Sequence, residues 1–415
     1  MEKVILVGIE YQDNFKNFPE SMEELQNLTE TAQGVVVGEL IQKRQTLDRR
    51  TLVGKGKLAE LAALVESKDA DMVIFNHEIT ARQARLIEDE VNTKVIDRVQ
   101  LILDIFAMRA KSKEGQLQVE LAQLNYLLPR LVGQGLTLSR LGGGIGTRGP
   151  GETKLETDRR HIRDKITAIK RELKETEEHR ERSRQKRKDS SVFQIGLIGY
   201  TNAGKSTIMN LLTDTKTYAE NQLFATLDPL TKKWPLPEGL ETTLTDTVGF
   251  IQDLPTQLIE AFQSTLEESR SVDLLLHVVD STSNNRSQQE KTVIELLDDL
   301  KMNHIPVLTV YNKADLLEDE DSFVPTLYPN CLISAYKESS KDILTEAIIK
   351  QMKEMFMPFE LILEAKDAYQ INQMQKQVFV DDYEYIEENN TYLVKGYAPF
   401  ESKWVRGEKE DELEF

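Results

Sequence analysis

The chain has little cysteine, little histidine and no long apolar run, and each shortage excludes a class of protein. Cys331 is the single cysteine among 415 residues, so an internal disulfide and a multi-cysteine metal cluster are both excluded. The five histidines lack the i, i+4 spacing and carboxylate context of a zinc enzyme, so we expect them on the surface or in the core. Apolar runs such as 4–8 and 274–279 are far shorter than the roughly 18 to 20 residues of a membrane span.

Composition otherwise fits an ordinary globular protein. Hydrophobic residues make up 40% of the chain and charged residues 29%, which suffices for the cores of two or three domains. The first residues, MEKVILVGIE, carry acidic side chains where a secretory signal needs bases, and no small-residue cleavage site follows a long apolar core. We therefore expect a cytoplasmic protein.

Charge is distributed unevenly along the chain. The net charge of −18 argues against nucleic-acid binding by the whole molecule, because a phosphate-binding surface must be basic. Residues 98–190, however, contain 21 basic and 13 acidic residues, a balance of +8, which leaves −26 for the remainder. This asymmetry predicts a polyanionic partner for the basic segment.

The first 97 residues predict a small α/β subdomain. Short β-rich runs at 4–7, 35–37, 72–75 and 94–96 alternate with helical stretches around 57–66 and 80–90. Gly54-Lys55-Gly56-Lys57 superficially resembles a phosphate-binding loop. It lacks both the four-residue spacer before Gly-Lys and the Ser or Thr after it, so we do not expect nucleotide binding there.

Residues 98–190 predict a long antiparallel helical hairpin with a glycine-rich connection. Each helix carries a narrow apolar stripe, formed by Leu117, Leu121, Leu124, Leu128 and Leu131 in the first and by Leu155, Ile162, Ile166, Ile169 and Leu173 in the second. Eight of the nineteen residues in the connection 133–151 are glycine. A flexible solvated link would have this composition. We favour a loop that orders against RNA, since arginine binds phosphate bidentately, with Arg140, Arg148 and Lys154 as the contacts.

Two further domains follow. From 191 to 358 strands and helices alternate, as in a P-loop NTPase domain of the G-domain type, and 359–415 reads as a small α+β domain with strands around 378–380 and 392–397. The predicted fold class is therefore α/β: an α/β unit and helical hairpin over 1–190, a G domain over 191–358, and an α+β domain over 359–415.

A phosphate-binding motif lies at the start of the predicted G domain. Gly199-Tyr200-Thr201-Asn202-Ala203-Gly204-Lys205-Ser206 follows the strand-like QIGLI and opens a helix that begins with Ser206 and Thr207, the context that G-x-x-x-x-G-K-[ST] requires. Backbone N–H groups at a helix N-terminus favour phosphate. We expect Lys205 to reach the β and γ phosphates and the Ser206 hydroxyl to ligate Mg²⁺.

Downstream residues complete the predicted catalytic machinery. Asp246-Thr247-Val248-Gly249 follows a strand, so Asp246 is the second candidate metal residue and the Gly249 N–H is expected to contact the γ-phosphate. Thr226, in Phe224-Ala225-Thr226, is the candidate hydroxyl that closes on Mg²⁺ in the triphosphate state. Lys205, Thr226 and Gly249 are thus the candidate catalytic residues.

Base selection is assigned to two later loops. Asn312-Lys313-Ala314-Asp315 follows the strand IPVLTVY, and Asp315 can accept hydrogen bonds from N1 and N2 of guanine, a donor pair that adenine lacks. Lys313 can lay its stem over the base. Ser334-Ala335 after CLI is expected to present a backbone N–H to guanine O6. Four motifs in this order, each after a strand, indicate a GTP-binding enzyme.

Together with RLGGGIGTRGPGETKLETDRR upstream, the motifs GYTNAGKS, DTVGF, NKAD and SA resemble those of the HflX family of translation-factor-class GTPases. The resemblance covers nearly the whole chain. It implies GTP hydrolysis coupled to binding of the large ribosomal subunit and to splitting of stalled or idle ribosomes, especially under heat stress. It also implies that the N-terminal region, including the loop from Arg140 to Arg148, reaches toward the peptidyl transferase centre.

Two residues of the motifs bear on the rate of hydrolysis. Phe250 stands where many GTPases carry a glutamine that orients the attacking water, so unassisted hydrolysis is expected to be slow. Asn202 occupies the position at which potassium-dependent GTPases often hold a coordinating asparagine. K⁺ there would neutralise charge, although the asparagine equally suits a cap of its own turn.

We predict a monomeric, nucleotide-timed switch that docks on the large subunit with GTP and Mg²⁺ and is released after hydrolysis. Two alternatives stay open: a GTPase that assembles or modifies RNA without splitting ribosomes, and a binding protein that sequesters subunits and uses GTP only to complete its fold.

Overall fold

The computed structural model describes residues 1–11, 17–131, 150–188, 192–213, 224, 229–247, 249–251, 270, 272–400 and 402–406. Contacts divide the chain into two compact units. The first comprises Met1–His179, Glu220–Asp228 and Ile251–Ser264, and the second comprises Arg180–Ala219, Pro229–Phe250 and Thr265–Phe415. Among the helices that the structure describes, none combines the length and apolar character needed to cross a bilayer.

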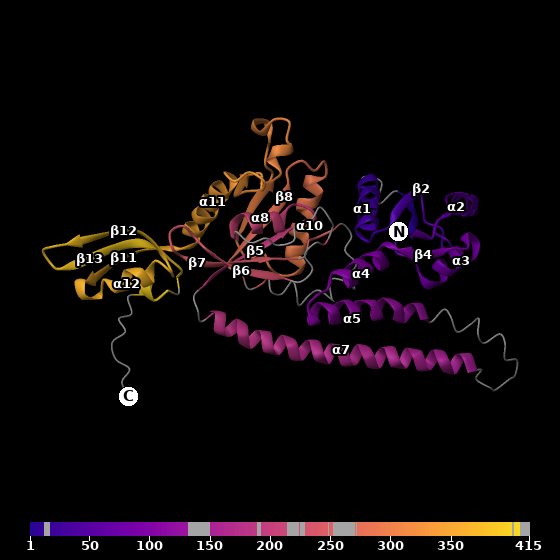
Figure 1. Ribbon diagram of the computed structural model, residues 1–415, viewed down its shortest axis with the longest axis horizontal. Helices are drawn as coiled ribbons and strands as arrows, with labels where there is room; N and C mark the ends of the chain where they lie inside the picture. The colour runs from indigo at the N-terminus through magenta and orange to yellow at the C-terminus, as the bar shows by residue number, and fades with distance from the viewer. Residues whose placement is uncertain are drawn as a thin grey trace. The chain divides into compact units, whose positions relative to one another are not determined.

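A four-stranded parallel sheet forms the amino-terminal part of the first unit (Figure 1). Its order is β2-β1-β3-β4, which places the switch in strand order between β1 and β3. The strands are β1 (Lys3–Glu10), β2 (Val35–Lys43), β3 (Met72–Phe75) and β4 (Lys94–Asp97). All four predicted strands are therefore confirmed.

Helices cover both faces of this sheet. α2 (Lys55–Lys68) and α3 (Ala81–Val91) share a core with one face, which includes Ile5, Val7 and Val73. α1 (Phe18–Thr31) lies against the opposite face, where a Cβ on Gly8 would come within 2.4 Å of Met22 Sδ. The sequence interpretation did not include α1, whose first turn contains a proline that suits a helix N-terminus.

Two antiparallel helices, α5 (Lys113–Arg130) and α7 (Pro150–Lys188), follow the short α4 (Arg98–Arg109). α5 begins at the cap Ser112, whose hydroxyl accepts the N–H of Gly115. The two helices lie side by side (Figure 1). The buried residues Leu121, Ile166 and Ile169 form the centre of their seam, and the partly buried residues packed against it are Leu117, Leu124, Leu128, Ile162 and Leu173. Of the other two predicted stripe residues, Leu131 is not part of this cluster and the Leu155 side chain lies outside the described residues. The predicted helical pairing is confirmed.

The second unit contains a six-stranded sheet in the order β10-β9-β8-β5-β7-β6. Its strands are β5 (Phe193–Gly199), β6 (Leu230–Pro235), β7 (Glu241–Asp246), β8 (Leu274–Asp280), β9 (Val307–Asn312) and β10 (Asn330–Leu332). All neighbouring pairs are parallel except β6 with β7. The carboxyl ends of β5, β7, β8 and β9 consequently lie at one edge.

Apolar side chains cover this sheet on both faces. α8 (Lys205–Thr213) and α11 (Ser340–Met355) contribute Ile208, Leu344 and Ile348 to the core on one face. α10 (Arg286–Asp299) contributes Val293 and Leu296 to a second cluster with Ile198 and Leu275. Because both faces are buried, the central strands are nearly continuous apolar runs, as in doubly wound α/β folds.

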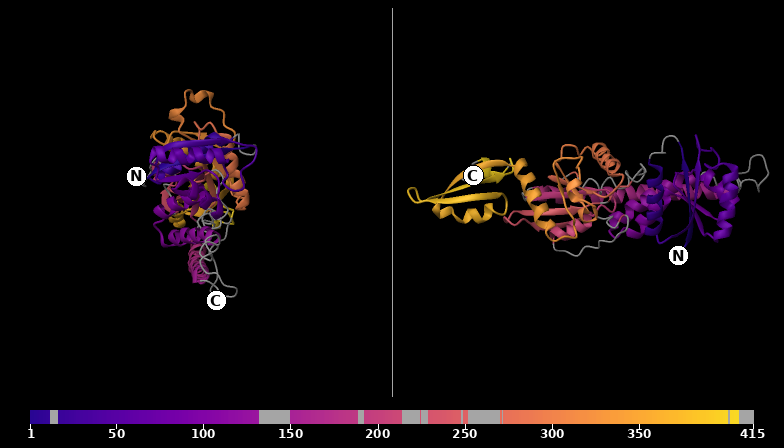
Figure 2. Two further views of the ribbon diagram at one scale, coloured as in Figure 1. Left: turned by 90° about the vertical axis from the view of Figure 1, so that its right-hand side faces the viewer. Right: turned by 90° about the horizontal axis from the view of Figure 1, so that it is seen from above.

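The carboxyl-terminal part of the second unit is an antiparallel sheet, β11-β13-β12, with α12 (Tyr369–Met374) on one face (Figures 1 and 2). Its strands are β11 (Met357–Glu364), β12 (Phe379–Ile386) and β13 (Thr391–Ala398), and α13 (Lys403–Arg406) ends the described chain. Val394, Met374 and Trp404 share its core. The sequence interpretation included the strands β12 and β13 but not β11.

Candidate functional site

The predicted motif loops of the second unit follow strands that lie side by side. Gly199 ends β5, Asp246 ends β7, Asp280 ends β8 and Asn312 ends β9, while Ser334 follows β10 by two residues. In parallel sheets the loops at the carboxyl ends of the strands form the ligand crevice. The sheet therefore brings the phosphate motif and the base motif, which are more than a hundred residues apart, to one edge.

Three residues in the phosphate loop have left-handed backbone angles. Gly199 has φ +148° and Gly204 has φ +101°, while Asn202 has φ 61° and is exposed. A Cβ on Gly199 would lie 2.2 Å from the Val278 carbonyl oxygen, and one on Gly204 would lie 2.2 Å from Asn312 Nδ2. Only glycine fits these two positions, and the resulting turn presents successive N–H groups at the N-terminus of α8.

Lys205 is buried within this loop. Its ammonium donates to the carbonyl oxygens of Gly199 at 3.1 Å and Tyr200 at 2.9 Å. Burial lowers the pKa of Lys205 to about 8, while the nearby Asp246 carboxylate acts in the opposite direction. A buried ammonium that donates to two carbonyl oxygens is well suited to bind phosphate, because a full negative charge in direct contact would compensate its desolvation.

The predicted metal residues lie within hydrogen-bond distance of each other. Ser206 Oγ donates to Asp246 Oδ2 at 2.7 Å, and Asp246 is 2% exposed. Among the described residues no group of three or more His, Cys, Asp or Glu could hold a metal. One hydroxyl and one carboxylate nevertheless suit Mg²⁺, which keeps several waters and takes the rest of its ligands from phosphates.

The segment after Asp246 is joined to the phosphate loop by its backbone. The Thr201 N–H donates to the Phe250 carbonyl at 2.7 Å, and the Phe250 N–H donates to the Gly199 carbonyl at 3.1 Å. A Cβ on Gly249 would lie 2.8 Å from Thr201 Cγ2 and 2.9 Å from Lys205 Nζ. Gly249 therefore lies directly over the lysine that the sequence assigns to the γ-phosphate.

The Phe250 side chain faces away from this chemistry. It is 4% exposed and belongs to the apolar cluster of Ile198, Val272 and Leu275. Thr247 is also buried, and its hydroxyl donates to the Leu197 carbonyl at 2.6 Å. Neither side chain has the position needed to orient a water on the phosphate.

Asn312 links the phosphate loop to the predicted base loop. Its Nδ2 donates to the Ala203 carbonyl and its Oδ1 accepts the Ala335 N–H, each at 2.9 Å. The Ser334 N–H donates to Ser340 Oγ at 3.2 Å. Since both N–H groups of Ser334-Ala335 have partners within the protein, a contact from this dipeptide to guanine O6 stays a prediction.

The other residues predicted to recognise the base follow Asn312 in the sequence. Lys313 has φ 68°, and its ammonium pairs with Asp280 Oδ2 at 2.6 Å. Asp315, in a short 3-10 turn, is exposed, as a carboxylate that must receive donors from a ligand should be. Sequence reasoning missed Asp280, although an aspartate at the end of the apolar strand LLLHVVD was a usable signal.

Buried hydroxyls without a partner mark the same edge of the sheet. Across the described parts of the chain, the buried hydroxyl oxygens that lack a hydrogen-bond partner belong to Thr201, Ser281 and Ser334. These follow β5, β8 and β10 respectively. Unpaired buried hydroxyls are costly, so their concentration here indicates a site built for a polar ligand.

Several predicted residues are not brought to this edge or are not described. Ala225, Thr226, Val248, Arg140 and Arg148 lie outside the described residues, as does the Lys154 side chain. Phe224 belongs to the first unit, where its ring is 2% exposed and packs edge-to-face on Phe106 with centroids 4.6 Å apart. Thr207 lies in the first turn of α8 and is half-buried.

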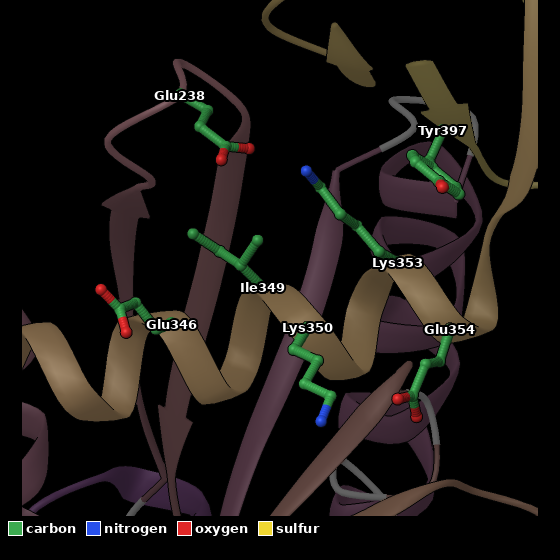
Figure 3. Close-up of a pocket in the computed structure, with 7 residues that line it drawn as sticks. All are labelled: Glu238, Glu346, Ile349, Lys350, Lys353, Glu354 and Tyr397. Carbon is green, nitrogen blue, oxygen red and sulfur yellow. The ribbon is translucent and has the colours of Figure 1, made fainter. Parts of the chain in front are cut away.

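A separate hollow of about 540 Å³ lies beside α11 (Figure 3). None of the predicted site residues lines it. Lys353 extends between Glu238 and Tyr397, whereas Lys350 points away, and Lys353 also pairs with Asp381 at 2.7 Å. Its lining mixes both charge signs, so no ligand of one charge is favoured.

A phosphate loop and an Asn-Lys-x-Asp loop at the carboxyl edge of one doubly wound sheet define a P-loop GTPase domain. Three family models match most of residues 19–313: a GTP-binding GTPase N-terminal region over residues 19–107, a GTP-binding GTPase middle region over 109–187, and a 50S ribosome-binding GTPase over 194–313.

Curated relatives match most of the chain. The chain is 50% identical to the GTPase HflX of Alkalihalophilus pseudofirmus over 399 residues, which cover 96% of this chain and 94% of the relative. It is 43% identical to the GTPase HflX of Escherichia coli, with 77% and 74% covered. The chain belongs to the HflX family of GTPases.

A solved structure shows the same fold. The crystal structure of the SsGBP and GDP complex has a TM-score of 0.50 and 24% identity, covering 85% of this chain and 98% of the other. The predicted α/β class with a P-loop GTPase domain is confirmed.

Proposed function

We propose that this chain is a Mg²⁺-dependent, GTP-hydrolysing factor of the cytoplasm that binds the large ribosomal subunit as a monomer. We further propose that it splits stalled or idle ribosomes under stress such as heat. The likeness to HflX GTPases along nearly the whole chain carries this proposal, because it includes the N-terminal and middle regions as well as the nucleotide site.

The nucleotide chemistry starts from the phosphate loop. The N–H groups of the loop and of the α8 N-terminus bind the phosphate oxygens, and the Lys205 ammonium exchanges its two carbonyl partners for the β and γ oxygens. Ser206 and Asp246, which are hydrogen-bonded to each other, are proposed to hold Mg²⁺, which would neutralise charge on the β and γ phosphates. Thr226 is proposed to add its hydroxyl in the triphosphate state.

Gly249 is the proposed sensor of the γ-phosphate. It lies against Lys205 and Thr201, so its N–H is close to where the terminal phosphate must sit. The next residue, Phe250, is hydrogen-bonded to the phosphate loop through its backbone. A γ-phosphate that competes for these groups would shift the Gly249–Phe250 segment, and hydrolysis would release it.

Hydrolysis by the free chain is proposed to be slow. Phe250 is buried in the core, so a water-orienting side chain is missing at its position. We propose that the ribosome supplies the positioning and that Asn202, exposed on the phosphate loop, helps to bind K⁺. Replacing KCl with NaCl is expected to slow GTP turnover, and equal rates in the two salts would contradict the K⁺ role.

The basic segment is the proposed ribosomal RNA contact. Arg140 and Arg148 belong to the stretch between α5 and α7, and Lys154 follows in the first residues of α7. All three lie in the part of the sequence with a local charge of +8. Glycine lets the backbone approach phosphates closely, while the arginines provide bidentate hydrogen bonds.

Pelleting with purified large subunits tests the partner and the switch together. We expect the full chain to pellet with subunits in the presence of a non-hydrolysable GTP analogue, and much less with GDP or without nucleotide. Equal pelleting in all three conditions would contradict the switch. A control variant, Asp315→Ala, should lose the response to the GTP analogue, because the carboxylate that reads guanine is gone.

Sucrose gradients then separate splitting from the other two functions. Release of subunits from intact ribosomes, dependent on GTP, is expected. Binding without release would favour a role in assembly or RNA modification, and release that persists in Asp315→Ala without nucleotide would favour simple sequestration of subunits.

A further inference from the structure

Asp280 ends β8 beside the base-recognition loop, and no motif of the sequence contains it. We propose that Asp280 is a positioning residue for nucleotide binding: it holds the Lys313 ammonium so that the lysine stem is already placed where the purine must stack. This role rests on the proposed guanine-nucleotide site, to which it adds the residue that orders the Lys313 side chain.

The carboxylate of Asp280 is fixed on both sides. Its Oδ2 pairs with Lys313 Nζ at 2.6 Å, while its Oδ1 accepts the Thr282 N–H at 3.0 Å and the Thr282 hydroxyl at 2.7 Å. The side chains of Lys313 and Asp280 are 20% and 19% exposed. A partly buried ion pair whose acid has its own hydrogen-bond partners is oriented much more strictly than a surface pair.

Strand register makes the pair possible. Asp280 lies directly opposite Asn312 in the β8–β9 ladder, and the Ser281 N–H donates to the Asn312 carbonyl at 2.9 Å. Lys313, the next residue, takes the left-handed conformation, which turns its side chain out of the strand direction. The Asp280–Lys313 ion pair thus joins the carboxyl ends of the neighbouring strands β8 and β9, directly after Asn312.

Asp280 assists nucleotide binding because it orders the Lys313 side chain before the nucleotide arrives. A free lysine has four rotatable bonds, and freezing them when the nucleotide arrives would weaken affinity. With the ammonium held at Asp280, the methylene stem is immobile before the purine stacks on it. Stacking on the lysine stem does not involve the exocyclic groups of the base, so we expect it to stabilise guanine and hypoxanthine nucleotides equally. Asp315, in contrast, is predicted to accept a hydrogen bond from the 2-amino group that hypoxanthine lacks.

A double-mutant cycle on the full chain tests this role, with GDP and IDP affinities measured by titration calorimetry. Asp280→Asn is expected to weaken both nucleotides about threefold to tenfold, the cost of ordering one long side chain. In a Lys313→Met background the same change is expected to have less than a twofold effect, because no ammonium remains to be held. GTP turnover should show a raised KM and an unchanged kcat.

Controls separate this mechanism from loss of structure. Asp381→Asn breaks the Lys353 pair, also 2.7 Å long but outside the site, and should leave GDP affinity unchanged. If Asp280→Asn fails to fold, Asp280→Glu keeps the charge while displacing the carboxylate and is measured in the same cycle. Equal losses with and without Lys313, or no loss in either background, would overturn the proposal. Failure of the wild-type chain to bind GDP would instead contradict the nucleotide site itself.

Discussion

Single buried polar side chains determine how the nucleotide-facing loops are held. Asn312 bonds to residues on two other loops, and the Lys205 ammonium donates to the Gly199 and Tyr200 carbonyl oxygens of the phosphate loop. These groups are satisfied mainly by main-chain carbonyls and N–H groups, which do not change when the sequence around them changes. The residue types at the site were therefore predictable, whereas their partners were not.

His277 makes stability depend on pH. It lies in β8, is 2% exposed, and burial together with the Lys205 charge lowers its pKa from 6.5 to about 4. At pH values between about 4 and 6.5, His277 is protonated in the unfolded chain but neutral in the folded chain. The contribution of His277 to the free energy of unfolding is therefore fully present above about pH 6.5 and is lost as the pH falls toward 4. Between pH 7 and pH 5 we expect the free energy of unfolding to fall by about 2 kcal/mol from this group.

Urea unfolding followed by tryptophan fluorescence measures that loss, since both tryptophans, Trp234 and Trp404, belong to the second unit. His277→Gln should remove this part of the pH dependence, whatever its stability at pH 7. The same loss on acidification in variant and wild type would show that another group titrates.

At the scale of elements, the α5–α7 pair has a narrow interface. Leu121, Ile166 and Ile169 are buried, and the rest of the stripe is only partly covered. Ion pairs between Lys165 and Glu120 and between Lys113 and Glu172 flank the seam, but these side chains are largely exposed and add little. Apolar packing at three positions therefore holds the two helices together.

Matched leucines on α5 test this conclusion. Leu121 is 9% exposed, whereas Leu127 on the same helix is 44% exposed. Leu121→Ala should cost about 2 to 4 kcal/mol of the stability of the helix pair, and Leu127→Ala about 0.5 kcal/mol or less. Hydrogen exchange of the α7 amides is the measurement: only Leu121→Ala should speed it strongly. Similar exchange rates in the two variants would contradict the conclusion that the buried apolar contacts hold α5 and α7 together.

For the whole molecule, binding to RNA depends more on where the charges lie along the chain than on the net charge. A chain with a net charge of −18 has one basic segment, while the remainder carries −26. A large RNA-rich particle would attract that segment and repel most of the rest, which favours one binding orientation. The overall acidity and the proposed RNA contact are thus compatible.

Salt dependence tests the basic contact. If Arg140 and Arg148 neutralise phosphates, Arg140→Ala/Arg148→Ala should reduce the slope of log affinity against log salt for large subunits by about 2. GTP turnover without subunits should stay unchanged, since neither residue belongs to the nucleotide motifs. An unchanged slope would place the RNA contact elsewhere, and Lys232→Ala/Lys233→Ala, on the edge strand β6, serves as the matched basic control.

Local signals account for what could be foreseen of the fold. The strands β1, β3, β5 and β9 are largely apolar runs, and the α5–α7 stripe repeats at helical spacing. Those elements were predicted. By contrast, α1 and β11 were missed, although both carried a usable signal: Phe18, Met22, Leu25 and Leu28 of α1 repeat at helical spacing, and β11 contains the apolar run 361–363.

The amino-acid sequence by itself determined the GTPase class, because the phosphate loop and the Asn-Lys-x-Asp motif depend on residue types at short, fixed spacings. The tertiary structure alone decided which distant groups meet: Asn312 with Ala203, 109 positions apart, and Lys313 with Asp280, 33 positions apart. Such contacts follow from the order β9-β8-β5-β7 at the carboxyl edge of the sheet, and strand order is set by burial of both sheet faces rather than by any local pattern.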